Sequence, residues 1–223
     1  MQFVFPVPTY LLGKMFFAAR LYAYPTIPEI LETTPKSPFV MLDSGAFHLA
    51  KAKKGYLAMD EAYMSKLALH YEKYKGERIY RIAPDVFLNP RQTIKNWERW
   101  HKNGYPADIV PVIQCEKKKR YSWKIIYEQT EVYREWQCPI VCFSNPGMRA
   151  HESPELLSEI ITMIRERTGA QHIHNLGAGW DVEDVREWRR QGIFDSIDSI
   201  SYYNSTRSPE VAIQIARQYM ACG

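Results

Sequence analysis

The sequence predicts an α/β fold: a single (β/α)8-type barrel, compact or partly reduced in size. Short apolar runs alternate with longer segments of helical periodicity along the chain. The runs are bounded by Pro, Gly, Ser or Asn, as buried parallel strands usually are. About seven such units fit into the 223 residues, and this alternation is typical of parallel α/β folds. An open, doubly wound sheet is the alternative arrangement.

Seven runs are predicted as strands because each is short and rich in β-branched or aromatic residues. In chain order they cover residues 3–7, 39–44, 79–85, 108–114, 138–144, 172–179 and 194–201. Five segments between them are predicted as amphipathic helices, namely 59–75, 91–104, 153–169, 181–192 and 208–223. The expected N-caps are Ser153 and Asp181, and the expected C-terminal glycines are Gly104, Gly169 and Gly192.

The composition predicts a single domain over residues 1–223. The hydrophobic share of 46% suffices for one core. A net charge of +4 fits a slightly basic surface and a nucleic-acid partner equally well. The four cysteines lack C-x-x-C spacing, which favours reduced, buried thiols over zinc or disulfides.

The predicted location is the cytoplasm, or the host cytoplasm if the source is viral. The apolar N-terminus is interrupted by two prolines and does not resemble a signal peptide. No apolar stretch approaches the roughly 20 residues of a membrane span, so no membrane partner is expected.

Polar residues lie at the ends of the predicted strands. They are Asp43 with Ser44 and Gly45, Asp85, Gln114, the run Gly177–Gly179, and the pair Asp195 and Asp198. In a parallel barrel, catalytic groups lie at the carboxyl ends of the strands. Capping explains a single aspartate as well as catalysis does, but it explains the whole set poorly.

The residue pattern favours carboxylate chemistry. The sequence contains no zincin histidine pair, no G-x-S-x-G elbow, no P-loop and no dinucleotide fingerprint. Paired carboxylates serve reactions at an anomeric carbon. Asp and Gln together also match the edge of guanine, because a carboxylate accepts from N1–H and the exocyclic amine.

The strand-end motifs resemble those of the tRNA-guanine transglycosylases, and more narrowly the 7-deazaguanine DNA transglycosylases of phages and bacterial modification clusters. "LDSGAF" is similar to the family's D-S-G-G-F/Y, "PDV" to its second aspartate motif and "VIQ" to its V-Q segment. "HNLGAG" is similar to H-L-F-G-A-G, and "DSISY" to D-S-A-S-Y. The resemblance runs from about Asp43 to Tyr202. It implies a (β/α)-barrel enzyme that replaces guanine in nucleic acid with a 7-deazaguanine through a covalent aspartyl–ribose intermediate.

The resemblance also implies the roles of individual residues. Asp198 is the expected nucleophile and Asp43 the general acid/base. Asp195 is a supporting residue or, in a shifted register, the nucleophile itself. The expected base-binding residues are Asp85 and Gln114 on the edge of the base, Phe47 and Leu176 on its two faces, and Ser44 and Gly177 within the same motifs. No metal and no organic cofactor are expected.

Departures from the family pattern favour DNA as the polymer. The zinc site C-x-C-x-x-C and an RNA-binding domain are absent from this sequence, and "VCFSNPG" replaces the family's Gly-Gly segment. The basic runs "KAKKGY" and "EKKKRYSWK" follow two strand ends and are expected to hold phosphates, or simply to form solvated surface. The alternatives are a tRNA-guanine transglycosylase of the queuosine or archaeosine type, a 7-deazaguanine nucleoside or base hydrolase, and an inactive partner subunit.

Overall fold

The computed structural model describes residues 2–6, 19–24, 39–51, 59–74, 76, 78–116, 121–144, 150, 152–177, 182–198 and 208–221. The strands are β1 (Gln2–Pro6), β2 (Ala19–Ala23), β3 (Phe39–Asp43), β4 (Ile79–Ile82), β5 (Ile109–Val110), β6 (Val112–Gln114), β7 (Ile140–Ser144), β8 (His172–Leu176) and β9 (Ser196–Asp198). The helices are α1 (Ala46–Lys51), α2 (Glu61–Lys73), α3 (Pro90–Lys102), α4 (Trp123–Arg134), α5 (Pro154–Thr168), α6 (Val182–Gln191) and α8 (Pro209–Ala221).

The described strands form a parallel sheet in the order β5-β4-β3-β2-β1-β9-β8-β7-β6. The predicted α/β class is therefore confirmed. The two strands at the ends of this order, β5 and β6, are consecutive in the chain and are separated only by Pro111. The Val110 carbonyl accepts from Ala83 N–H at 2.8 Å, and the Pro111 carbonyl accepts from Cys142 N–H at 2.9 Å. Residues 109–114 thus pair with β4 through β5 and with β7 through β6.

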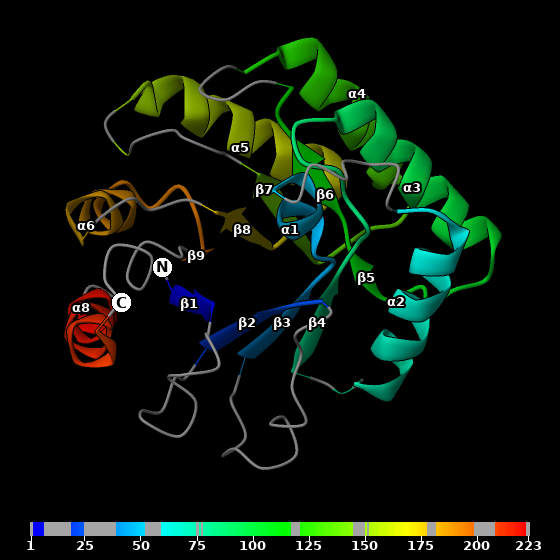
Figure 1. Cartoon of the computed structure of the whole chain (residues 1–223). Helices are drawn as coiled ribbons and strands as arrows, with labels where there is room; N and C mark the ends of the chain where they lie inside the picture. Colours follow the sequence, from blue (N-terminus) through cyan, green and yellow to red (C-terminus); the bar gives the residue numbers. More distant parts are fainter. Residues whose placement is uncertain are drawn as a thin grey trace.

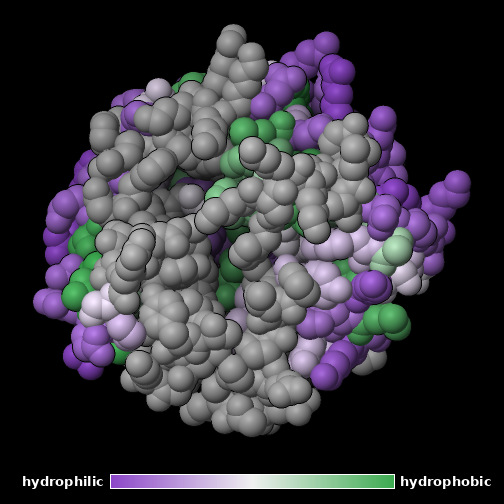
Figure 2. Space-filling model, viewed as in Figure 1, coloured by the Kyte–Doolittle hydropathy of each residue, from purple (hydrophilic) through white to green (hydrophobic). Residues whose placement is uncertain are grey.

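The described helices flank the strands on several sides. Figure 1 shows the strands in the middle of the view, with α2 to α6 and α8 outside them and α1 across the middle. Where α2 and α3 lie, at the right of Figure 2, the outer surface is largely hydrophilic. Both helices therefore turn an apolar side inward, and α3 buries Trp97 and Trp100.

Alternating strand residues enter two separate apolar clusters. The larger cluster lies between strands and helices and includes Val40, Leu42, Val141, Phe143, Ile173 and Ile197. The smaller one lies on the opposite face of the strands and contains Leu21, Phe39, Met41, Ile82, Val110, Val112, Ile140 and Cys142. Both faces are covered by apolar side chains, which explains why the strand sequences are almost continuously apolar.

The structure adds three elements that the sequence prediction lacks: β2, α1 and α4. It also divides the predicted strand 108–114 at Pro111. The last strand is described over Ser196–Asp198, and residues 199–201 of the predicted run lie outside the described residues. Gly104, Gly169 and Gly192 follow helix ends with φ values of 68°, 72° and 66°, as predicted. Asp181 lies outside the described residues.

The predicted N-cap position of α5, Ser153, is confirmed, but the capping hydrogen bond is absent. Ser153 directly precedes the helix, but its backbone is left-handed, with φ at 52°, and its side chain makes no capping hydrogen bond. A capping hydroxyl reaches the first N–H groups from an extended backbone, which Ser153 does not adopt.

Cys115, Cys138 and Cys142 are buried and free, as predicted. Within the described ranges, the helices are too short or too polar to cross a membrane.

Candidate functional site

Polar side chains gather at the carboxyl ends of the strands, on the face of the smaller apolar cluster. Gln114 is level with Ser144 on the next strand, and Ser144 is level with Leu176 on the one after that. Asp43 ends β3 two residues after Met41, and Asp198 ends β9. Because side chains alternate along a strand, Asp43, Gln114 and Ser144 each follow an apolar residue on this face of their strand. Leu176 and Asp198 instead follow polar residues on the same face, namely His174 and Ser196.

Asp85 is held by hydrogen bonds from two side chains. Ser44 Oγ donates to Asp85 Oδ1 at 2.6 Å, and Gln114 Nε2 donates to Asp85 Oδ2 at 2.6 Å. All three side chains are buried. Burial raises the pKa of Asp85 to about 6, although the hydrogen bonds from Ser44 and Gln114 oppose that shift. The structure thus brings three predicted base-binding residues together.

Gln114 is held in place from α4. Gln129 Oε1 accepts from Gln114 N–H at 2.8 Å, and Gln129 Nε2 donates to the Gln114 carbonyl at 3.0 Å. The Gln114 side-chain oxygen accepts from Leu88 N–H at 3.4 Å, and Leu88 has a positive φ of 56°. These contacts orient the Gln114 carboxamide so that its nitrogen faces Asp85.

Asp43 lies near both other carboxylates. Burial is the largest cause that raises its pKa to about 8, followed by the negative charges of Asp85 and Asp198. Backbone N–H groups of Gly45 and Ser44 oppose the shift. An elevated pKa of this kind keeps Asp43 protonated at neutral pH, so the group can act as an acid.

The turn after Asp43 requires glycine at position 45. Gly45 has a φ of 84°, and a Cβ there would lie 2.5 Å from the Tyr24 carbonyl oxygen and 2.8 Å from Tyr63 Oη. Tyr63 Oη–H donates to the Ser44 carbonyl at 2.8 Å. The glycine of "LDSGAF" therefore lets the chain pass closely under Tyr24 and hold Asp43 and Ser44 at the strand end.

Asp198 is buried and hydrogen-bonded by β8 and the residue that follows it. Gly177 N–H donates to Asp198 Oδ1 at 2.7 Å, and His174 Nε2 lies 3.1 Å from the same oxygen. Gly177 has a φ of 72°, which favours glycine. His174 has no exposed surface. The predicted residues Gly177 and Asp198 are thus in direct contact.

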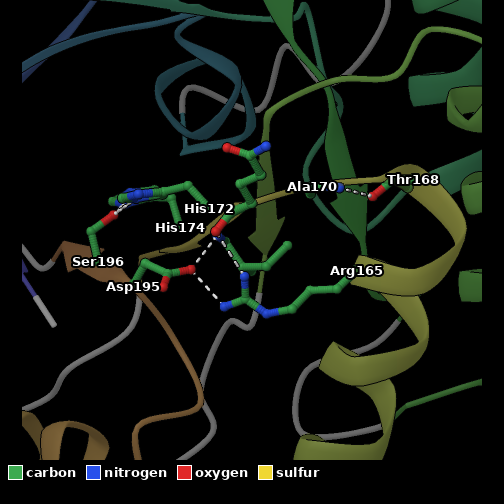
Figure 3. Close-up of polar contacts among 9 residues, drawn as sticks. Arg165, Thr168, Ala170, His172, His174, Asp195 and Ser196 are labelled. Carbon is green, nitrogen blue, oxygen red and sulfur yellow. Dashed lines mark hydrogen bonds and ion pairs between the residues drawn. The ribbon is translucent and has the colours of Figure 1, made fainter.

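Asp195 lies apart from this group. Its Oδ2 accepts from an Arg165 guanidinium nitrogen at 2.6 Å and from Ile173 N–H at 2.7 Å. Figure 3 shows Asp195 directed toward Arg165 on α5, while Ser196 points toward the two histidine rings. Asp195 therefore joins β8 to α5, and its partners account for its charge.

Phe47 and Leu176, the predicted faces of a base sandwich, differ in exposure. Phe47 lies on α1 with 44% of its surface exposed and contacts Phe87 edge to face, with ring centroids 5.5 Å apart. Leu176 is half-buried and packs against the smaller apolar cluster. Phe47 is accessible for stacking on a planar ligand, and Leu176 presents one apolar side.

Several site residues escaped the sequence prediction, which assigned no role to Tyr63, Gln129, His172, His174 or Ser196. His172 and His174 are two residues apart, as are Ser196 and Asp198, and this period-two spacing is the signal that puts each pair on one face of a strand. Gln129 and Tyr63 lie on helices and act on backbone atoms, for which the sequence carries no comparable signal.

Other predicted features fall outside the described residues. These are most of the basic runs after Lys51 and Glu116, residues 145–147 of the segment "VCFSNPG" that replaces the family's Gly-Gly, and residues 178–181. Among the residues that are described, no group of three or more His, Cys, Asp or Glu side chains could hold a metal ion.

Comparison with known proteins identifies no relative: neither a protein-family model nor a curated protein matches this sequence.

Proposed function

We propose that this protein is a guanine transglycosylase that exchanges guanine in DNA for a 7-deazaguanine base, such as 7-cyano-7-deazaguanine, through a covalent aspartyl–sugar intermediate. The observation that carries the proposal is the convergence of Asp43, Asp85 and Asp198 from three strands, with Asp85 held by Ser44 and Gln114. Such a set supplies a nucleophile, an acid/base group and an acceptor for the edge of a purine.

We also infer that the scaffold is a closed (β/α)8-type barrel. If residues 109–114 are counted as one strand, β4 pairs with the part before Pro111 and β7 with the part after it. Each strand then has two parallel neighbours, as closure requires. The carboxyl ends of barrel strands are where active sites form, and this is the end at which the candidate residues lie.

Asp198 is the nucleophile of the proposed reaction. One of its carboxylate oxygens attacks C1′ of the target nucleotide, the C1′–N9 bond breaks, and a sugar–aspartyl ester forms. The donors at Gly177 and His174 fix the carboxylate for this attack. The ion pair of Asp195 with Arg165 favours a structural role for Asp195 and supports Asp198 over the alternative register.

Asp43 acts first as an acid and then as a base. With a pKa of about 8 it carries a proton at neutral pH and can deliver it to the departing guanine, which leaves as a neutral base. The resulting carboxylate removes the N9 proton of the incoming 7-deazaguanine. N9 then attacks C1′, the ester breaks, and Asp198 and Asp43 return to their starting forms.

Asp85 and Gln114 select the base. An ionised carboxylate has about four acceptor positions, and Ser44 and Gln114 occupy two of them. The others can accept from N1–H and the exocyclic amine of guanine, groups that a 7-deazaguanine retains. The second N–H of the Gln114 amide has no acceptor among the described residues and could donate to O6. Phe47 and Leu176 would stack on the two faces of the flipped base.

The proposal is tested by label exchange. Purified protein is incubated with radiolabelled guanine and with double-stranded DNA, single-stranded DNA or unmodified tRNA, with and without excess 7-cyano-7-deazaguanine. Incorporation of label into DNA that the deaza base suppresses is the expected result. Incorporation of label into tRNA alone would indicate a tRNA-guanine transglycosylase instead. Release of free base without incorporation would indicate a hydrolase, and no reaction with any polymer would indicate an inactive subunit.

A further inference from the structure

A chain of polar side chains runs behind Asp198 along β8 and β9. Ser196 Oγ lies 2.6 Å from His172 Nε2 and 2.8 Å from His174 Nδ1. The other ring nitrogen of His174, Nε2, lies 3.1 Å from Asp198 Oδ1. Figure 3 shows the Ser196 side chain directed at both imidazole rings. His174 and Ser196 are directly paired across the two strands, so the backbone register brings them together.

The direction in which the hydrogen bonds run from His172 through Ser196 to His174 decides which ring nitrogen of His174 carries the proton. A serine hydroxyl has one proton and can donate it to only one of the two rings. Burial, and next the neighbouring His174, lower the pKa of His172 to about 4, so His172 is neutral at neutral pH. If His172 Nε2–H donates to Ser196 and Ser196 donates to His174 Nδ1, then a neutral His174 carries its proton on Nε2. All three contacts, including the one to Asp198, are then hydrogen bonds.

The opposite direction leaves a mismatch at Asp198. Ser196 would donate to His172, His174 Nδ1–H would donate to Ser196, and a neutral His174 would turn a bare Nε2 toward Asp198 Oδ1. Two acceptors would then face each other at 3.1 Å. Gly177 N–H already donates to that oxygen at 2.7 Å, which suits an ionised carboxylate. The first direction satisfies every group in the chain.

The surroundings of the two rings fit this arrangement. The ring of Phe39 stacks on His172, with centroids 5.7 Å apart. The thiol of Cys142, which is level with His174 on β7, has its pKa raised by burial and remains uncharged. Asp195, which raises the pKa of His172, is itself paired with Arg165, which lowers it.

We propose that Ser196 and His172 hold His174 in the tautomer that carries its proton on Nε2, and that His174 thereby acts as the positioning residue of Asp198. The inference rests on the proposed function, because the role of Asp198 as nucleophile is assigned there. The second nitrogen of a histidine commonly sets which nitrogen is protonated. Here that second contact is the hydroxyl of Ser196, which lies 2.8 Å from His174 Nδ1.

Nuclear magnetic resonance of the protein labelled with ¹⁵N at histidine tests the tautomer without an activity assay. Long-range ¹H–¹⁵N correlations distinguish the Nε2–H tautomer, the Nδ1–H tautomer and the doubly protonated ring. The His174→Gln variant assigns the signal. We expect the Nε2–H tautomer in the wild type, a mixture of tautomers in Ser196→Ala, and no change in Ser122→Ala, because Ser122 makes no capping bond. An Nδ1–H tautomer or an imidazolium in the wild type would overturn the proposal.

Two substitutions at position 174 test the positioning role. The Gln side chain can place an amide N–H near the site of His Nε2, whereas Asn is too short to do so. We expect His174→Asn to lower kcat for base exchange by ~10–100-fold with KM for DNA unchanged within about twofold. His174→Gln should recover most of that loss. Equal rates in both variants would overturn the positioning role.

Failure of the proposed function can be told apart from failure of this inference. If the wild-type protein exchanges no base with any polymer, the proposed function fails, and the histidine spectra still decide whether Ser196 and His172 fix the tautomer. If exchange occurs but the tautomer is wrong, the proposed function stands and the positioning role of His174 falls.

Discussion

Asp43 and Asp198 lie at the ends of two strands of the same sheet, but they differ in the hydrogen bonds and the nearby charges that act on their carboxyl groups. Asp198 receives a backbone N–H from Gly177 and contacts a histidine ring. Asp43 is raised in pKa by burial and by the charges of Asp85 and Asp198. Hydrogen-bond donors stabilise a carboxylate, whereas burial and like charges stabilise the acid. In the proposed reaction, one residue type would therefore serve in two roles, as the nucleophile at β9 and as the acid at β3.

The largest effect should come from removing the nucleophile. We expect Asp198→Asn to lower base exchange ~10⁴-fold or more, because the amide cannot form the sugar ester. The isosteric change keeps the fold, which circular dichroism can check. The measurement is incorporation of labelled guanine into DNA, together with a denaturing gel that traps the protein–DNA ester.

The matched control for that variant lies three residues away. Asp195→Asn breaks the ion pair with Arg165, so it should lower the melting temperature but leave exchange measurable. If Asp195→Asn abolished exchange and Asp198→Asn did not, the two carboxylates would have to trade roles.

The next largest effect should come from the base-reading carboxylate. Asp85→Ala removes the acceptor for N1–H and the exocyclic amine, and it leaves the Ser44 and Gln114 donors without their partner. We expect the affinity for free guanine to fall ~10–100-fold, equivalent to ~1–3 kcal/mol. Isothermal titration calorimetry with guanine and with 7-cyano-7-deazaguanine measures it. Unchanged affinity would contradict the role of Asp85.

The pH dependence of kcat/KM should reflect the ionisation of both Asp43 and Asp85. The pKa of Asp43 is about 8 and that of Asp85 about 6. Because the reaction needs Asp43 protonated and Asp85 ionised, kcat/KM should be highest between these values and fall about tenfold per pH unit outside them. Asp43→Asn should remove the alkaline limb from whatever activity remains. If the alkaline limb persisted in this variant, Asp43 would not be the acid.

Asp43 should also make the fold less stable as the pH rises. Its pKa is near 3.8 in an unfolded chain and about 8 in the folded protein. A raised folded pKa gives a contribution that is complete below about pH 4 and lost as the pH rises through about 8. Asp43 is partly exposed, which reduces the effect. We expect Asp43→Asn to raise the free energy of unfolding by about 1–3 kcal/mol at pH 8 relative to pH 4.

Chemical denaturation at the two pH values measures this difference. Glu159→Gln, a change at an exposed position of α5, is the control and should shift stability equally at both pH values. A stability gain in Asp43→Asn that is the same at pH 4 and pH 8 would show that the carboxyl is not responsible.

The smallest effect should come from Ser44. Its hydroxyl donates to Asp85 and lowers the pKa of that carboxyl. Ser44→Ala should therefore move the acid limb of the pH profile upward, by about half a unit to one unit. Ser44→Thr keeps the hydroxyl and should leave the limb in place. A downward shift in Ser44→Ala would contradict the direction of the hydrogen bond.

The strands that could be predicted from the sequence are short runs rich in β-branched or aromatic residues. The missed strand β2, "ARLYA", has no β-branched residue, and only its pairing with β1 and β3 makes it a strand. The missed helix α4 buries Gln129 and Thr130 beside Ile126 and Tyr133. Two polar residues on its inner face obscure the apolar periodicity on which the prediction depends.

The candidate site was predictable only in part, for the same reason. The carboxylates at strand ends could be predicted because the sequence pattern indicates where strands end. Asp85, with Ser44 and Gln114 as its hydrogen-bond donors, is one such group. The pairing of His174 with Ser196 depends on the register of β8 against β9, which one sequence does not reveal. The same is true of Gln129, whose role follows from how α4 packs on β6.

The contacts of Asp198 distinguish its two oxygens. Both hydrogen bonds that the structure gives this carboxylate within the described residues end on Oδ1. In the proposed reaction, Oδ2 is then the oxygen that bonds to the sugar, and Oδ1 becomes the carbonyl oxygen of the ester. That carbonyl stays within reach of the same donors when the bond breaks and negative charge returns. Gly177 and His174 would therefore serve the departure of the sugar as well as its capture.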